Sequence, residues 1–426
     1  MLFRSNIIDM EALFFSPFII LTIACVLGFF AAWGIGANDV ANAMGTSVGS
    51  KALTLKQAVI IAAIFEFLGA FLAGGEVTST IRKGIVDPLL YQDDVNIFIV
   101  GMMATLLATG SWLMLASRNG WPVSTTHSIV GAIVGFVLIT KGSGAVSWDK
   151  IFEIASSWIT SPLISALLAF LIFKSVKMLI IDSKNRSKSA VNLIPIYVIL
   201  VVFVILQVTF RKGLVHIGLV WENSEIIQYS LILSLVIGIV SFLYLRSRSS
   251  DFGSKAGIET AFSLLMVVAA CAMAFAHGSN DVANAIGPLA AIASIASSGG
   301  VIESNATVSP LILLLGGAGI VTGLAMYGHK VIKTVGEKIT KLTPSFGFSA
   351  NIATASTVVF ASYLGFPIST THTLIGGVIG VGLANSVKEI DWRSVINIFM
   401  SWLITIPVGA IFTILFYVIL RVLFGV

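Results

Sequence analysis

Long apolar stretches separated by short polar segments run through almost the whole chain. Most of them approach the roughly 20 residues that an α-helix needs to cross a hydrocarbon core about 30 Å thick. Several are short or are interrupted by Gly and Pro. We count about twelve, near residues 16–36, 52–74, 95–117, 127–140, 149–181, 192–210, 226–245, 258–277, 307–328, 350–364, 373–384 and 394–425. The pattern predicts an all-α polytopic membrane protein with about twelve transmembrane segments in a lipid bilayer.

Two polar motifs interrupt the apolar pattern, and both occur twice in the same order. Asn-Asp-Val-Ala-Asn-Ala begins at Asn38 and returns at Asn280. Pro-x-Ser-Thr-Thr-His follows each copy, beginning at Pro122 and at Pro367. From the first Asn to the Ser of the partner motif is 86 residues in one half (38 to 124) and 89 in the other (280 to 369). Because polar groups within membrane segments are costly and usually functional, the duplication indicates a functional site.

The duplication also divides the chain. We assign residues 1–178 to a first repeat of about five spans, 179–255 to a basic linker and a central two-span connector, and 256–426 to a second repeat of about five spans. Seven spans separate the two Asn-Asp motifs, and an odd number makes the copies enter the membrane from opposite sides. This predicts two inverted-topology repeats with broken or re-entrant helices meeting at the midplane.

Composition and charge agree with a membrane protein. The chain is 57% hydrophobic and 11% charged, against about 25% charged in a typical soluble domain. Basic residues concentrate in the polar segments 174–190, 246–255 and 329–341. The positive net charge therefore indicates how the chain is oriented in the membrane and does not point to a nucleic-acid partner. With these segments in the cytoplasm, twelve spans place both termini outside the cell. We expect a multi-pass protein of the inner (plasma) membrane.

The Asn-Asp motifs have the chemistry of a cation site. Their side-chain oxygens lie among small residues, where a broken helix would also release carbonyls, and oxygen ligands suit a hard cation such as Na⁺. Glu66 lies deep in an apolar span, where a carboxylate pairs with a cation or takes up a proton. A helix cap or turn is the alternative for a single motif. The candidate Na⁺ ligands are Asn38, Asp39, Asn280, Asp281 and Glu66.

The Ser-Thr-Thr runs have the chemistry of an anion site. Each follows a proline and precedes a short apolar segment, as at a helix N-terminus, where free N–H groups and hydroxyls bind anions. Plain capping is the alternative. Two such termini facing each other would surround a tetrahedral oxyanion with donors. The candidate anion ligands are Ser124, Thr125, Thr126, Ser369, Thr370 and Thr371, together with Asn42, Asn284, Asp39 and Asp281.

The charges of these motifs predict coupling to a cation. Asp39 and Asp281 would repel an anion strongly in a low dielectric, and neither motif contains Arg or Lys. Bound cations must therefore neutralise the site, which favours symport. For His127, His277 and His372 we expect hydrogen bonds at helix ends, because no metal-ligand spacing is present. Trp158 and Trp402 are expected to serve in packing or as interfacial anchors.

At these residues the sequence resembles the inorganic phosphate transporter (Pit/PiT) family of secondary carriers, over nearly the whole chain. The resemblance implies symport of phosphate with Na⁺ or H⁺ through an inverted-repeat fold, without ATP, by a homodimer. It places the family's important acidic positions on Asp39, Asp281 and Glu66. The chain departs from some members at Asn351, where they carry Glu. It lacks the long soluble insertion of animal relatives and so resembles a compact prokaryotic member.

We therefore expect uptake of inorganic phosphate driven by a Na⁺ gradient through alternating access, with Na⁺ as coupling ion and no organic cofactor. Proton coupling through Glu66, Asp39 or Asp281 is the alternative, and a sulfate carrier on the same scaffold is another. The Asp pair favours phosphate, because HPO₄²⁻ can donate a hydrogen bond to a carboxylate. An anion channel has no need of paired cation sites. Duplication gains nothing for an intramembrane hydrolase, so we do not expect an enzyme.

Overall fold

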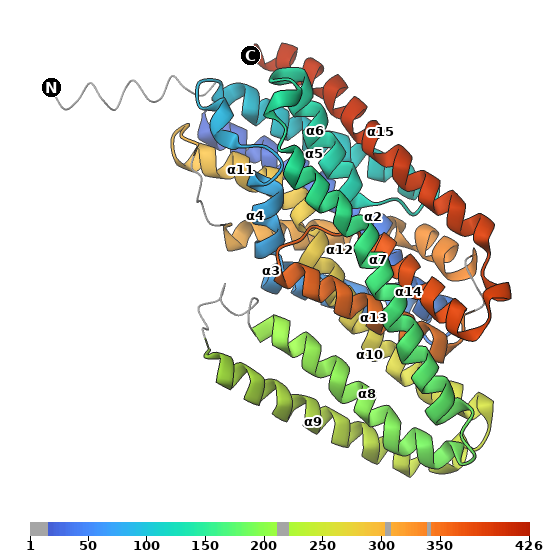
Figure 1. Ribbon diagram of the computed structural model, residues 1–426. Helices are drawn as coiled ribbons and strands as arrows, with labels where there is room; N and C mark the ends of the chain where they lie inside the picture. The colour runs from blue at the N-terminus through green and yellow to red at the C-terminus, as the bar shows by residue number, and fades with distance from the viewer. Residues whose placement is uncertain (1–15, 211–220, 303–307, 339–341) are drawn as a thin grey trace.

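The computed structural model describes residues 16–210, 221–302, 308–338 and 342–426 (Figure 1). Its described part is helical, with one isolated β-bridge between Val86 and Val146. The all-α class is confirmed. The helices are α2 Pro17–Gly49, α3 Leu55–Ala73, α4 Gly75–Lys83, α5 Val95–Arg118, α6 Thr125–Thr140, α7 Trp148–Val176, α8 Arg186–Val208, α9 Asn223–Ser247, α10 Lys255–Asp281, α11 Ala283–Ser297, α12 Pro310–Lys338, α13 Pro344–Tyr363, α14 Thr370–Asn385 and α15 Trp392–Phe424.

The structure divides the twelve predicted apolar stretches into two groups. Nine segments of the described chain are long and apolar enough to cross a membrane. The remaining three stretches fall in α6, α13 and α14. At about 1.5 Å per residue, the 16-residue helices α6 and α14 are shorter than a hydrocarbon core. Because α6 is one of the seven stretches between the two Asn-Asp motifs, the inverted topology stays a prediction.

The two halves of the chain interlock. Helix α2 of the first half packs along α12 of the second. The crossing is close, because a Cβ on Gly36 would collide with the backbone of Ile320 and a Cβ on Gly323 with the backbone of Trp33. Small residues at such positions let helix backbones approach each other.

An equivalent contact joins α10 of the second half to α3 of the first. Here Gly278 lies against the backbone of Glu66, and Gly69 lies against the backbone of Phe275. Gly278 thus corresponds to Gly36, and Glu66 corresponds to Ile320. Helices of opposite halves also pack together toward the C-terminal end of each half, where α6 packs on α15 and α14 packs on α7.

The two copies of the Asn-Asp motif differ in backbone. In the second, α10 ends at Asp281 and α11 begins at Ala283, with a long 3.4 Å hydrogen bond from the Val282 N–H to the Gly278 carbonyl. In the first, α2 continues without interruption, so the expected broken helix is wrong there. Pro288 lies inside α11, six residues after this break, whereas α2 has no proline in this region. The first copy therefore offers side-chain oxygens and keeps its carbonyls in the helix.

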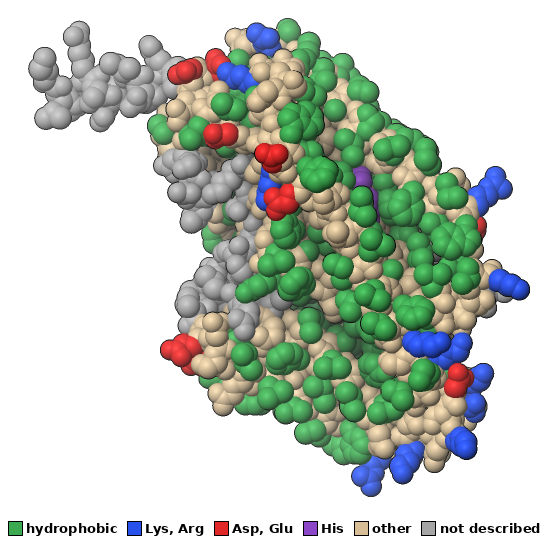
Figure 2. All heavy atoms as spheres, in the orientation of Figure 1, with side chains coloured by type: hydrophobic (Ala, Val, Ile, Leu, Met, Phe, Trp, Pro, Cys, Tyr) green, Lys and Arg blue, Asp and Glu red, His purple; other side chains and the backbone are tan. Residues whose placement is uncertain are grey.

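Charge is distributed unevenly between the two ends of the helices. Figure 2 shows Lys and Arg side chains gathered where α7 leads to α8 and α9 leads to α10, and most Asp and Glu side chains in view toward the opposite end. The last turns of α12 and the start of α15 lie at this basic end, while α4 and the C-terminus lie at the other (Figure 1). We refer to the two ends as the basic face and the opposite face.

Candidate ion and anion site

The Asn-Asp and Ser-Thr-Thr motifs of each half meet in the interior. The Thr125 hydroxyl donates to Asp39 Oδ2 at 2.7 Å, and the Thr370 hydroxyl donates to Asp281 Oδ2 at 2.6 Å. Each threonine is the first residue of its helix, α6 or α14. Hydrogen bonds to an ionised carboxylate are short and strong. The predicted cation and anion motifs are therefore in direct contact within each half.

Asparagine side chains connect the halves to each other. Asn42 Nδ2 donates to the hydroxyls of Thr370 and Thr371 at 3.2 and 2.9 Å. Asn284 Nδ2 donates to the hydroxyls of Thr125 and Thr126, both at 3.2 Å. The hydroxyls of Thr125 and Thr370 thus each donate to an aspartate of their own half and accept from an asparagine of the other half.

The two serines of the Ser-Thr-Thr runs act as helix caps. Ser124 Oγ accepts the N–H of His127 at 3.2 Å, and Ser369 Oγ accepts the N–H of His372 at 3.3 Å. This is the capping arrangement that the sequence offered as an alternative. It still leaves each serine beside the threonines that contact Asp39 and Asp281.

The second threonine of each run binds the backbone of the other half. Thr126 Oγ1 donates to the Ile368 carbonyl at 2.8 Å, and Thr371 Oγ1 donates to the Val123 carbonyl at 3.3 Å. The starts of α6 and α14 therefore lie against each other, as two facing helix N-termini require for a shared anion site.

Asn38 and Asn280 hold the loops that lead into α6 and α14. Asn38 Nδ2 donates to the Trp121 carbonyl at 2.9 Å, and Asn38 Oδ1 accepts the Val123 N–H at 3.1 Å. Asn280 Nδ2 donates in the same way to the Phe366 carbonyl at 3.1 Å. Asn280 Oδ1, in contrast, has no hydrogen-bond partner in the described chain. Of the two asparagines among the proposed Na⁺ ligands, only Asn280 has a side-chain oxygen without a hydrogen-bond partner in the described chain.

Three buried carboxylates surround one histidine. His277 Nε2 lies 3.0 Å from Asp281 Oδ2 and 3.8 Å from Asp39 Oδ2, and His277 Nδ1 lies 3.3 Å from Glu66 Oε1. All four side chains are at most 1% exposed. One ligand atom from each of Asp39, His277 and Asp281 falls within 4.8 Å of the others, as in a metal site.

This cluster has too little positive charge of its own. Three ionised carboxylates carry −3, and one imidazole supplies at most +1. No Lys or Arg of the described chain forms an ion pair with any of them. Asp39 Oδ1 and Asp281 Oδ1 also have no hydrogen-bond partner there. Because a buried uncompensated charge is strongly unfavourable, the cluster is suited to bind cations.

His277 was not among the site residues assigned from the sequence, which predicted a hydrogen bond at a helix end. It lies about one turn from the end of α10, four residues before Asp281 and on the same face of the helix, but its ring contacts carboxylates. The spacing of four residues between His277 and Asp281 could have indicated from the sequence that His277 belongs to the site. Because Gly278 corresponds to Gly36, His277 corresponds to Ile35 of the first half, just as Glu66 corresponds to Ile320. The residues that correspond to His277 and Glu66 are therefore both apolar.

His127 and His372 occupy a separate cluster in the first turns of α6 and α14. The His127 ring lies 3.8 Å from the Trp158 ring, and the His372 ring stacks on Trp402 at 3.4 Å between centroids. His127 Nδ1 lies 3.2 Å from the Trp402 carbonyl, and His372 Nδ1 lies 3.3 Å from the Trp158 carbonyl. The expected hydrogen bonds at helix ends and the packing role of both tryptophans are confirmed.

Asn351, at which the sequence departs from the resemblance described above, joins α13 to the end of α2. Its Oδ1 accepts the Thr46 hydroxyl at 2.7 Å, and its Nδ2 donates to the Ala43 carbonyl at 3.3 Å. A neutral amide therefore contacts α2 at Ala43 and Thr46, one and four residues beyond Asn42 of the site.

Comparison with known proteins gives consistent matches. A family model described as the phosphate transporter family matches residues 35–413, which include both copies of each motif. A protein of Haemophilus influenzae, provisionally named a phosphate permease, is 50% identical over 407 residues, covering 95% of this chain and 97% of the relative. The chloroplastic inorganic phosphate transporter 2-1 of Arabidopsis thaliana is 43% identical over 417 residues, covering 92% of this chain and 70% of the relative. A solved structure described as the sodium-dependent phosphate transporter superimposes with a TM-score of 0.89 at 40% identity, covering 95% of this chain and 99% of the other.

Proposed function

The chain belongs to the phosphate transporter family, and on that premise we propose that it is a secondary symporter that brings inorganic phosphate into the cell with Na⁺. Family membership makes it a membrane transporter of phosphate and not an enzyme. The choice of Na⁺ as coupling ion is our own inference. It agrees with the similarity to a protein described as sodium-dependent.

One observation carries the proposal of cation coupling. Asp39, Glu66 and Asp281 are buried around the single imidazole of His277, and carboxylate oxygens there have no hydrogen-bond partner in the described chain. A phosphate dianion cannot approach three carboxylates unless cations enter with it. Carboxylate and amide oxygens are the ligands that a hard cation prefers. We assign Asp39, Asp281, Glu66 and Asn280 Oδ1 to the Na⁺ shell, with Asn38 as a supporting residue.

The threonine hydroxyls provide a physical link between the two ligands. Thr125 and Thr370 donate to Asp39 and Asp281 in this structure. A Na⁺ ion that takes the carboxylate lone pairs would release these hydroxyls to donate to an anion. The anion would lie at the facing N-termini of α6 and α14, with the Asn42 and Asn284 amides beside it. Each ligand then favours binding of the other by the same factor.

We further propose that residues 1–178 and 256–426 are inverted repeats joined by the connector 179–255. The exchanged helix contacts and the matched Thr–Asp and Asn–Thr bonds support this. Transport would then follow alternating access around a fixed central site. We place the protein in the inner (plasma) membrane with the basic face in the cytoplasm and both termini outside, and we expect a homodimer.

Two alternatives follow from specific observations. Proton coupling is favoured by the contact of His277 with Glu66, because an imidazole and a carboxylate can share a proton. Sulfate transport is favoured by the hydroxyl and amide donors, which suit either tetrahedral anion. Phosphate remains preferred, because HPO₄²⁻ can donate to an aspartate.

Uptake of labelled phosphate into proteoliposomes tests the proposal. Na⁺ and pH gradients are imposed separately, and unlabelled sulfate is added as competitor. We expect accumulation above equilibrium with the Na⁺ gradient alone and no competition by sulfate. Accumulation driven only by the pH gradient would establish H⁺ coupling. Equilibration without accumulation under either gradient would overturn symport and indicate a channel.

A further inference from the structure

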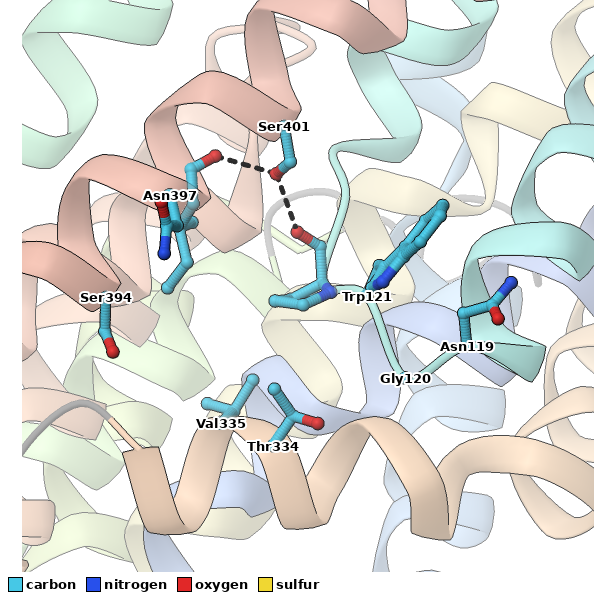
Figure 3. A pocket seen from close by; sticks show the side chains of 10 residues that line it. Asn119, Gly120, Trp121, Thr334, Val335, Ser394, Asn397 and Ser401 are labelled. Atoms are coloured by element: carbon cyan, nitrogen blue, oxygen red, sulfur yellow. Dashed lines mark hydrogen bonds between the residues drawn. The ribbon is translucent and has the colours of Figure 1, made fainter.

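A cavity of about 330 Å³ opens on the basic face, next to the site. It lies between the loop after α5, the last turns of α12 and the start of α15 (Figure 3). Trp121 from the loop, Thr334 from α12 and Asn397 from α15 stand around it in Figure 3. Ser401 of α15 donates to the Pro122 carbonyl at 3.3 Å and ties α15 to the loop.

The loop segment that lines this cavity also contacts residues of the central site. The extended segment 121–123 is held from the inside by Asn38, which bonds the Trp121 carbonyl and the Val123 N–H. Thr371 donates to the Val123 carbonyl from the other half. Two residues after Val123 the chain reaches Thr125, which contacts Asp39. A short movement of segment 121–123 would therefore connect the cavity to the Thr–Asp pair.

Basic residues adjoin the lining residues of the cavity in the sequence. Lys330 Nζ donates to the Arg118 carbonyl at 3.3 Å, next to the lining residues of the loop. Lys333 is exposed one residue before the lining part of α12, and Arg393 is exposed one residue before the lining part of α15. Asp391, which caps α15, is the acidic group nearest in sequence. A basic rim raises the local concentration of anions and speeds their association.

The equivalent position on the opposite face is closed by a hydrogen bond. Thr80 of α4 donates to the Gly365 carbonyl at 2.8 Å, in the loop before α14. Thr80 lies eleven residues after Gly69, and Thr334 lies eleven residues after the corresponding Gly323 (80 − 69 and 334 − 323). Yet Thr334 donates to the Lys330 carbonyl of its own helix, at 3.4 Å. Two equivalent threonines thus have different partners on the two faces.

We propose that the cavity is the phosphate vestibule on the basic face and that the Thr80–Gly365 hydrogen bond is the latch that closes the opposite mouth. The Thr334 hydroxyl already lies beside Gly120, where an added Cβ would meet it at 3.2 Å. In the alternate state it would donate to the loop carrying Gly120 and close the basic mouth, and Thr80 would release Gly365. The inference rests on the proposed transport of phosphate and identifies the pathway to that site.

Sided cysteine labelling tests the vestibule. Asn397→Cys is made in a Cys25→Ala/Cys271→Ala background, and Ser250→Cys in the basic loop between α9 and α10 marks the basic face of reconstituted vesicles. A membrane-impermeant maleimide applied to the basic face should label Asn397→Cys and block phosphate transport. Saturating phosphate with Na⁺ should slow the labelling. Transport at the unmodified rate after complete labelling would overturn the vestibule, whereas absence of transport before labelling would overturn the proposed function instead.

A matched pair of variants tests the latch. Ile368, only 2% exposed behind the opposite mouth, is replaced by Cys as a reporter. Thr80→Val removes one neutral hydrogen bond, so labelling of this cysteine from the opposite face should become about two- to tenfold faster. Thr334→Val should produce no such increase, because Thr334 has no bond across the mouth in this state. An unchanged rate in Thr80→Val, or the same increase in both variants, would overturn the latch.

Discussion

Replacing Thr125 by Val tests whether one hydroxyl links the cation and the anion. The substitution keeps the branched shape and removes the donor to Asp39 Oδ2, 2.7 Å away, and the acceptor of Asn284 Nδ2, 3.2 Å away. Asp39 is 1% exposed, so no solvent replaces the lost donor. A hydrogen bond to a charged group contributes about 1.5–3 kcal/mol, and about 1.4 kcal/mol corresponds to tenfold in affinity.

The half-saturating concentration of phosphate should rise about tenfold to a hundredfold, because the anion loses the donor that Na⁺ releases to it. The half-saturating concentration of Na⁺ should fall, because Na⁺ no longer has to displace the Thr125 hydroxyl from Asp39. Initial uptake into proteoliposomes is measured against phosphate at saturating Na⁺, and against Na⁺ at saturating phosphate. Thr105→Val is the control, because Thr105 is buried in α5 and donates only to the Met102 carbonyl of its own helix. If Thr125→Val matched this control in both titrations, the hydroxyl would not couple the ligands. A change in the phosphate titration alone would leave Thr125 in the anion site and refute the link to Na⁺.

Three further predictions concern the carboxylates and the helix crossing. Asp39→Asn or Asp281→Asn should abolish Na⁺-driven accumulation while the purified protein stays monodisperse; full Na⁺-dependent uptake in either would remove that residue from the cation shell. His277→Gln should destabilise the Na⁺-free protein by about 3–5 kcal/mol, as loss of a buried partner does. In a thermal melt, added Na⁺ should restore much of the lost stability. The same melting temperature with and without Na⁺ would contradict a cation site there. Gly323→Ala should greatly reduce folded protein, because the added Cβ meets the Trp33 backbone, whereas Gly144→Ala, with open space around it, should not. Equal yields of the two glycine variants would refute the close crossing.

The sequence by itself predicted the membrane class and the positions of twelve of the fourteen described α-helices, because hydrophobic length is a local property. Helices α4 and α11 fall outside the predicted stretches. Each of the twelve apolar stretches contains a helix. The polar motifs lie in the interior, as their cost in a membrane requires. Duplication also singled out Asp39, Asp281 and the threonines that contact them. Within each half, the Asn-Asp motif contacts the Ser-Thr-Thr motif that comes after it in the sequence.

Contacts between the halves were decided only by the tertiary structure. Asn42 and Thr370 are 328 residues apart, and nothing local to either residue indicates that α2 meets α14. The position of His277 among three carboxylates depends in the same way on α10 packing against both α2 and α3. The uninterrupted helix α2 likewise departs from what the motif alone suggested.

A duplicated sequence predicts two equivalent mouths, yet Thr80 is bonded across one and Thr334 is not bonded across the other. The repeat determines which residues can form either latch. Which of the two threonines is bonded across its mouth depends on how the helices of the two halves pack, because the two positions are equivalent in the repeat.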